Sequence, residues 1–128
     1  MTPEKETSTL TKPEDAIESL IQPLKPVVVH IQVRPWCTDM IRIWPSTFLL
    51  DCNSNHTNAL IGFKNITSYP TWTRIDYTQP YDFTLVFEGL PKSVRSFDLA
   101  EIIPEKNGFR IQGIRRNQVD VYNEELYD

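Results

Sequence analysis

The chain has 128 residues, of which 40% are hydrophobic and 11% aromatic, and it contains two cysteines. This length suits one soluble domain that buries a core without needing metals or disulfides. Ten prolines and four glycines favour many short elements over a helical bundle, and no hydrophobic run is long enough for a membrane-spanning helix.

The formal net charge of −4 is distributed unevenly along the chain. Residues 1–20 carry −3 and residues 119–128 carry −4, so the residues between them carry +3. This basic excess is small, and neither a basic stripe nor an RNA-binding aromatic motif accompanies it, so nucleic acid is not an expected partner. The first residues lack the basic and apolar regions of a signal peptide, which predicts a cytoplasmic location.

The sequence divides into three parts. Residues 1–25 form a flexible polar segment with a short predicted helix, which would begin at the capping-box residues Thr11 and Glu14. Residues 26–118 contain the strand patterns and form the predicted domain. Residues 119–128 form an acidic C-terminal tail, whose first part, residues 119–122, is also interpreted as a last edge strand.

Alternating apolar residues predict the strands of this domain. The clearest alternation runs from Val27 to Val33, with Val27, Val29, Ile31 and Val33 on one face. Further extended segments are expected at residues 40–44, 47–51, 60–66 and 109–114. Gly62 suggests a bulge, and the pair Asn107 and Gly108 suggests a tight hairpin turn before the last of these segments.

Residues 83–103 contain two alternating apolar runs separated by a turn at residues 89–92. Glycine and proline in this turn end the first run, so a second strand should begin near Val94 and direct Phe97 and Leu99 inward. The segment is predicted to be either a β-hairpin or a corner between sheets. Six or seven short strands without intervening helices predict an all-β fold of antiparallel sheets packed as a sandwich.

Two stretches, from Trp44 to Asp51 and from Phe83 to Leu99, resemble small β-sandwich modules of uncharacterised Bacteroidetes proteins. The resemblance covers about half of the chain. It implies an immunoglobulin-like sandwich of about seven strands, a bacterial source and a binding or scaffolding role, since some of these modules accompany thioredoxin-like domains in exported proteins. It implies no catalytic residue. We expect neither an export signal nor a second domain here, and both expectations depart from those modules.

Two histidines and two cysteines, His30, Cys37, Cys52 and His56, are residue types that bind zinc. Their spacing lacks the Cys-x-x-Cys pair of zinc signatures, so neither a metal site nor a cofactor is predicted. The cysteines are expected to be reduced, or to form a disulfide in an oxidising compartment. A nucleophile–base pair of Cys52 and His56 oriented by Asp51 lacks a glycine-rich oxyanion loop, so the chain is not predicted to be an enzyme.

The aromatic connection at residues 68–82 contains the candidate binding residues, which are Tyr69, Trp72, Arg74, Tyr77 and Tyr81. Aromatic rings among polar side chains suit stacking on a sugar or anchoring a protein partner. Alternatively, Trp72 and Tyr81 cover an open end of the sandwich, and Trp36 and Trp44 are interpreted in the same way.

The sequence therefore predicts a non-catalytic module that binds or assembles with a protein partner. One alternative is carbohydrate binding through the aromatic loop at residues 69–81. Another is a small Cys/His-dependent hydrolase or a metal-site protein that uses Cys52 and His56. Exposed edge strands would also permit a homodimer.

Overall fold

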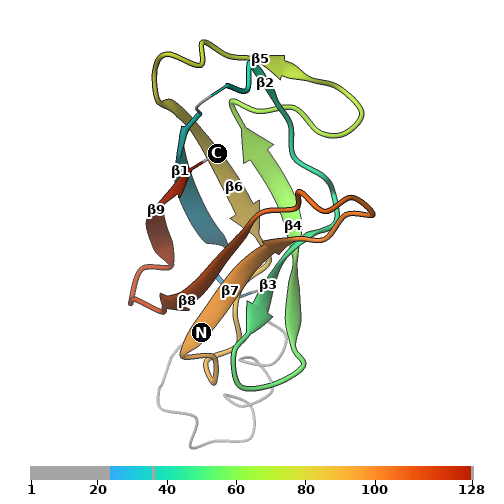
Figure 1. The fold of residues 1–128 in the computed structure, drawn as a ribbon. Helices are drawn as coiled ribbons and strands as arrows, with labels where there is room; N and C mark the ends of the chain where they lie inside the picture. Colours follow the sequence, from blue (N-terminus) through green and yellow to red (C-terminus); the bar gives the residue numbers. More distant parts are fainter. Residues whose placement is uncertain (1–23, 36, 128) are drawn as a thin grey trace, which may run out of the picture.

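The structure is a computed structural model that describes residues 24–35 and 37–127. The predicted N-terminal helix lies outside the described residues. All the regular secondary structure of these residues consists of β-strands, so the all-β prediction is confirmed there (Figure 1). The strands are β1 (Val27–Arg34), β2 (Met40–Ile41), β3 (Thr47–Asp51), β4 (Thr57–Lys64), β5 (Thr73–Arg74), β6 (Tyr81–Phe87), β7 (Ser96–Glu101), β8 (Arg110–Arg115) and β9 (Val121–Tyr127).

Seven strands form one sheet in the order β8-β7-β3-β4-β6-β1-β9, while β2 and β5 pair separately at one end of the molecule (Figure 1). Neighbouring strands are antiparallel except β1 and β9, which run parallel. The prediction of purely antiparallel pairing was therefore wrong at this pair. The reason is topological: after β8 the chain crosses to the opposite edge of the sheet, so β9 arrives beside β1 in the same direction.

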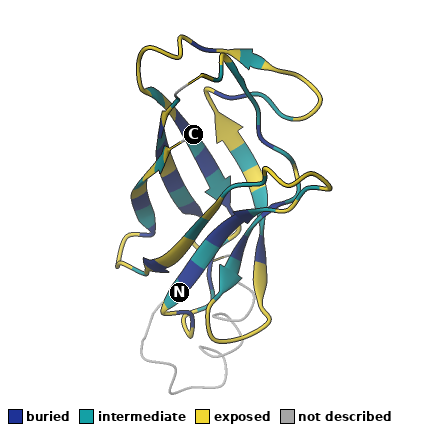
Figure 2. Ribbon diagram, in the orientation of Figure 1, coloured by how far each residue is buried: buried dark blue, intermediate teal, exposed yellow. Residues whose placement is uncertain are grey.

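The two ends of the sheet share one hydrophobic core. Phe97 of β7 packs edge-on against Tyr122 of β9, with ring centroids 5.2 Å apart, although these strands belong to opposite ends of the strand order. The sheet must curl for this contact to form, and Figure 2 shows buried residues concentrated in β1, β6 and β7. The predicted inward face of β1 is confirmed, since Val27, Val29, Ile31 and Val33 are all buried.

β4 explains how the sheet curls. Its first residues, 57–59, pair with β3, whereas Leu60 to Lys64 pair with β6. The predicted bulge is confirmed, because the register with β6 shifts between Leu60 and Gly62. A bulge bends its strand and increases the local twist. β4 therefore connects two groups of strands that face each other across the core.

The segment at residues 83–103 is a corner and not a hairpin. It contributes β6 and β7, which are separated in the sheet by β3 and β4. Phe97 and Leu99 are fully buried, as predicted, and Leu90 and Val94 of the connection also lie in the core. The hairpin interpretation was wrong because strand adjacency depends on long-range pairing, which the local turn does not specify.

Three other segments differ in detail from their predicted form. β7 and β8 do form a hairpin, but its connection spans residues 102–109 and is not a tight turn. Gly108 is needed there because a Cβ would clash with the carbonyl oxygen of Glu101. The strand expected at 40–44 is limited to Met40–Ile41 and an isolated bridge at Ile43, and the last edge strand lies at Val121–Tyr127.

Candidate functional site

Four side chains gather near the β2–β5 end of the molecule, and we call them the aromatic–arginine cluster: Arg42, Trp44, Tyr69 and Trp72. The guanidinium carbon of Arg42 lies 3.7 Å from the ring centroid of Trp72 and 4.5 Å from that of Tyr69. The rings of Trp44 and Tyr69 lie 3.9 Å apart with an interplanar angle of 30°. One cation is therefore held among aromatic rings at distances typical of cation–π contacts.

Main-chain hydrogen bonds bring the two segments of the cluster together. The N–H of Ile43 donates to the carbonyl of Thr67, and the N–H of Tyr69 donates to the carbonyl of Ile43. Ile43 is fully buried, so its neighbours Arg42 and Trp44 face away from the core. Arg42 Nη1 also donates to the carbonyl of Pro70 at 3.1 Å, which ties the guanidinium to the loop that carries Trp72.

The cluster remains open to solvent on part of its surface. Trp72 is 49% exposed and Tyr69 is 44% exposed, whereas Trp44 is partly buried. Because the rings and the guanidinium already support one another, these side chains lose little conformational freedom when a ligand contacts them. The cluster therefore presents a pre-ordered aromatic surface.

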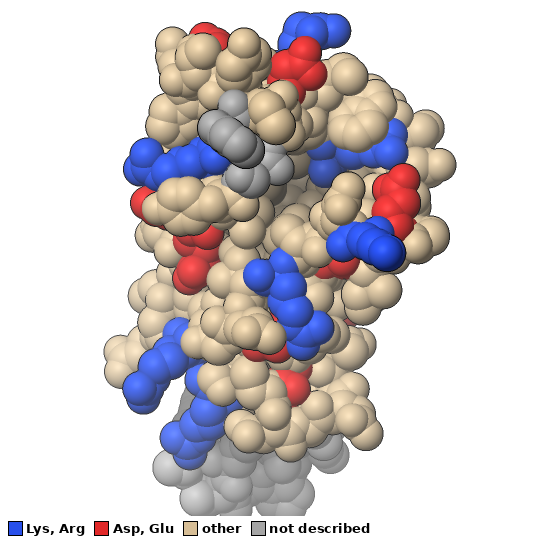
Figure 3. All heavy atoms as spheres, in the orientation of Figure 1, with Lys and Arg blue, Asp and Glu red and all other residues tan. Residues whose placement is uncertain are grey.

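A cleft of about 320 Å³ adjoins the cluster. Its floor reaches the nearly buried core residues Val33, Ile66 and Phe83, and its rim carries charged side chains that include Arg42 and Glu105. On the face shown in Figure 3, basic and acidic side chains are interspersed. The cleft therefore combines an apolar floor with a rim of mixed charge.

Glu101 connects the cluster to the β7–β8 hairpin. One of its carboxylate oxygens accepts the backbone N–H of Trp44 at 3.1 Å. Burial raises the pKa of Glu101, and the nearby Glu105 carboxylate adds to this, while hydrogen bonds from the N–H groups of Trp44 and Phe109 and the charge of Arg42 act in the opposite direction. Glu101 therefore fixes the position of one wall of the cleft relative to the other.

The structure brings two of the predicted binding residues, Tyr69 and Trp72, into the cluster. The other three lie outside it. Arg74 forms an exposed ion pair with Asp39 at 3.5 Å, Tyr77 is exposed in a turn, and the hydroxyl of Tyr81 donates to the carbonyl of Asn65. Trp36 lies outside the described residues.

Sequence reasoning missed Arg42 as a member of this site and read Trp44 only as a cover for the core. A usable signal was present, since Ile41 and Ile43 alternate with Arg42 and Trp44. This alternation directs the two larger polar or amphipathic side chains to the same outer face.

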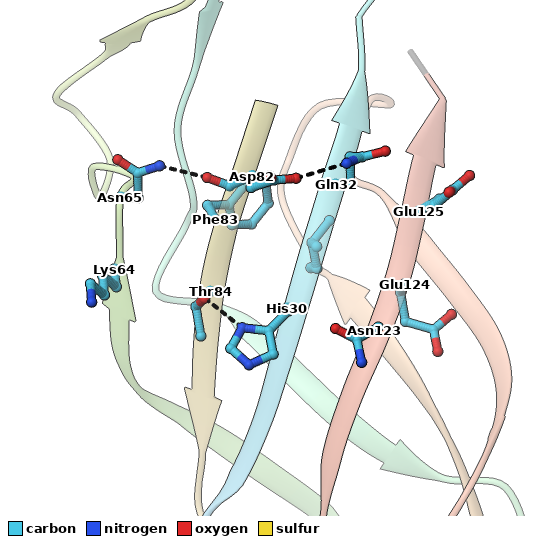
Figure 4. A pocket seen from close by; sticks show the side chains of 11 residues that line it. His30, Gln32, Lys64, Asn65, Asp82, Phe83, Thr84, Asn123, Glu124 and Glu125 are labelled. Atoms are coloured by element: carbon cyan, nitrogen blue, oxygen red, sulfur yellow. Dashed lines mark hydrogen bonds between the residues drawn. The ribbon is translucent and has the colours of Figure 1, made fainter. Parts of the chain in front are cut away.

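A second, larger hollow lies on the outer face of β4, β6, β1 and β9 and has a volume of about 880 Å³ (Figure 4). Its polar side chains largely bond to their neighbours: His30 Nδ1 lies 2.8 Å from Thr84 Oγ1, and Gln32 donates to Asp82. Its lining contains no exposed aromatic ring comparable to Trp72. This hollow has the properties of a solvated outer sheet face, so the cluster is the stronger candidate.

The cysteine and histidine candidates lie elsewhere in the fold. Cys52 Sγ lies 3.5 Å from Asp98 Oδ1, and the Asp51 carboxylate accepts hydrogen bonds from Ser54 and Asn53, which lower its pKa. Both cysteines are exposed and unbridged. Within residues 24–35 and 37–127, no three His, Cys, Asp or Glu side chains are grouped to hold a metal ion.

No family model, curated protein or solved structure matches this chain. In the described part of the chain, no helix is long and apolar enough to cross a membrane.

Proposed function

We propose that this chain is a non-catalytic protein-binding module whose contact surface is the aromatic–arginine cluster. The observation that carries the proposal is the half-exposed ring of Trp72 stacked on Arg42 at 3.7 Å. Trp, Tyr and Arg are the residue types most enriched among the energetic hot spots of protein interfaces. The cluster places all three on one patch.

The supporting scaffold is, in this proposal, an immunoglobulin-like sandwich. The division of β4 between β3 and β6 and the contact between Phe97 and Tyr122 support two layers around one core. The cluster lies on the connections at one end of these layers. Binding residues commonly occupy loops that a rigid scaffold positions, which is the arrangement expected of such a module.

Carbohydrate binding is the second candidate, because the cleft that contains Trp72 also contains Asn107 and Glu105, whose polar groups suit sugar hydroxyls. Protein binding is favoured over it by the stacking within the cluster. Arg42 covers one face of Trp72, and the rings of Trp44 and Tyr69 cover each other. Fewer ring faces are then available to stack on a sugar.

Site-specific photo-cross-linking in the native cell tests the proposal. A photoreactive residue replaces Thr71 in one variant and Tyr77 in another, since both are exposed and only the first adjoins Trp72 of the cluster. We expect a discrete protein adduct at position 71 that is absent at position 77 and is lost on Trp72→Ala. Identical adducts at both positions would overturn the proposal, and Trp fluorescence quenched by glycans would favour the second candidate.

A further inference from the structure

We propose that the cleft beside the aromatic–arginine cluster holds an extended peptide segment of the partner protein. In this segment, one apolar side chain is flanked by an acidic residue on the side of Arg42 and by a basic residue on the side of Glu105. The inference rests on the proposed protein-binding function and specifies the chemistry of the partner.

The apolar floor of the cleft requires the apolar side chain. Val33, Ile66 and Phe83 belong to the hydrophobic core, and each is at most 8% exposed, yet all three line the cleft. A ligand group that enters this space contacts the core itself. Removing apolar surface from water at this point favours a hydrocarbon side chain over a polar one.

The two walls of the cleft carry opposite charges. Arg42 belongs to the wall formed by the chain after β2, and Glu105 belongs to the connection between β7 and β8. A ligand with charge of a single sign would be attracted to one wall and repelled by the other. A segment with both signs, arranged on either side of the apolar group, matches the two walls.

Arg42 is well prepared to receive a carboxylate. Its flat guanidinium surface is stacked on aromatic rings, and Nη1 donates to Pro70. A guanidinium has five N–H donors, so others remain for a planar carboxylate, which it can bind through two parallel hydrogen bonds. A stacked arginine is also already ordered, which lowers the entropic cost of this contact.

Glu105 is the acidic group available to the ligand. It is exposed, whereas the neighbouring Glu101 is half-buried and is engaged by the backbone of Trp44. Glu101 holds the two walls of the cleft together, and Glu105 forms an ion pair with the basic residue of the peptide. The two carboxylates of the same wall therefore have different roles.

Selection of peptides from a random display library against the full chain tests the inference. The baits are the wild type, Arg42→Glu, Glu105→Lys and Trp72→Ala, with Arg74→Glu as a control because Arg74 is exposed outside the cleft. We expect the wild type and the control to select the proposed pattern. Arg42→Glu should exchange the selected acidic residue for a basic one, and Glu105→Lys should make the reverse exchange.

A peptide selected on the wild type should bind the Arg42→Glu variant about tenfold more weakly, because an attraction becomes a repulsion. Circular dichroism of each bait establishes that it is folded. Peptides that require Trp72 but ignore both charge reversals would overturn the inference and leave the proposed function standing. Peptides that bind independently of Trp72 would overturn both, and a library without enriched peptides would overturn the cleft as a peptide site.

Discussion

Arg116 and Asp120 form a two-point ion pair, with Nε to Oδ1 and Nη2 to Oδ2 both at 3.1 Å. The remaining three N–H groups of Arg116 donate to the carbonyls of Leu90, Pro91 and Val94. All five guanidinium donors are therefore used. This arrangement joins the corner between β6 and β7 to the turn before β9, so it closes the end of the fold opposite β2 and β5.

Arg116→Ala should destabilise the fold by about 3 kcal/mol, because it leaves the nearly buried carboxylate of Asp120 and three carbonyls without their partner. Urea unfolding followed by circular dichroism measures this change. The adjacent Arg115 is exposed, so Arg115→Ala should change the free energy of unfolding by no more than about 0.5 kcal/mol. Equal effects of the two substitutions would contradict the role assigned to Arg116.

Tyr122 should cause the fold to lose stability at high pH. Its hydroxyl donates to Asp120, and burial, followed by the hydrogen bond to Asp120 and its charge, raises the pKa of Tyr122 to about 12. The raised pKa means that the folded state holds the proton more tightly than the unfolded state. The associated stability is complete below pH 10 and is lost as the pH rises toward 12, at no more than about 1.4 kcal/mol per pH unit.

Urea midpoints measured at pH 9, 10 and 11 test this expectation. The Tyr122→Phe variant is the control, since it removes the titrating hydroxyl while retaining the ring that packs against Phe97. Its stability should depend less on pH above 10 than that of the wild type. The prediction fails if the two proteins lose stability in parallel.

Glu101 should make the stability of the fold depend on pH in the acidic range. Because burial raises its pKa, the folded state favours the neutral carboxyl, and the associated stability is present at low pH and declines as the carboxyl ionises. Glu101→Gln keeps a neutral acceptor for the N–H of Trp44. Relative to the wild type, the Glu101→Gln variant should therefore be more stable at pH 7 than at pH 4. If the difference in unfolding free energy between the two proteins is the same at both pH values, burial does not raise the pKa of Glu101.

We expect Glu124 to keep the edge strand β9 from pairing with other chains. β9 is an edge strand, and its register places Glu124 between Tyr122 and Leu126 on the core-facing side, where burial raises its pKa. Inward-pointing charges on edge strands oppose edge-to-edge association. We expect Glu124→Val to increase self-association in sedimentation experiments, whereas Glu125→Val, on the opposite face, should have a smaller effect. A Glu124→Val protein that sediments like the wild type would disprove this.

The strands were predictable where their residues alone decide the outcome. The alternation of β1, the bounds of β3 and the bulge at Gly62 follow from local patterns of side chains. The parallel pairing of β9 with β1 could not be predicted in this way, because it depends on where the chain crosses after β8. Likewise, Arg42 and Trp72 are thirty residues apart in the chain, and their segments meet through the long-range pairing of β2 with β5 and the bridge between Ile43 and Ser68.

The parallel pairing of β1 and β9 also has a mechanical consequence. Among the described residues β1 is the first strand and β9 the last, so the start of β1 and the end of β9 lie at opposite ends of the same strand pair. A force applied between these two points acts along the strands and strains the hydrogen bonds from Val28 to Arg34 together, whereas antiparallel terminal strands would open one bond at a time. Held at its two ends, this domain would resist extension through a set of hydrogen bonds that share the load.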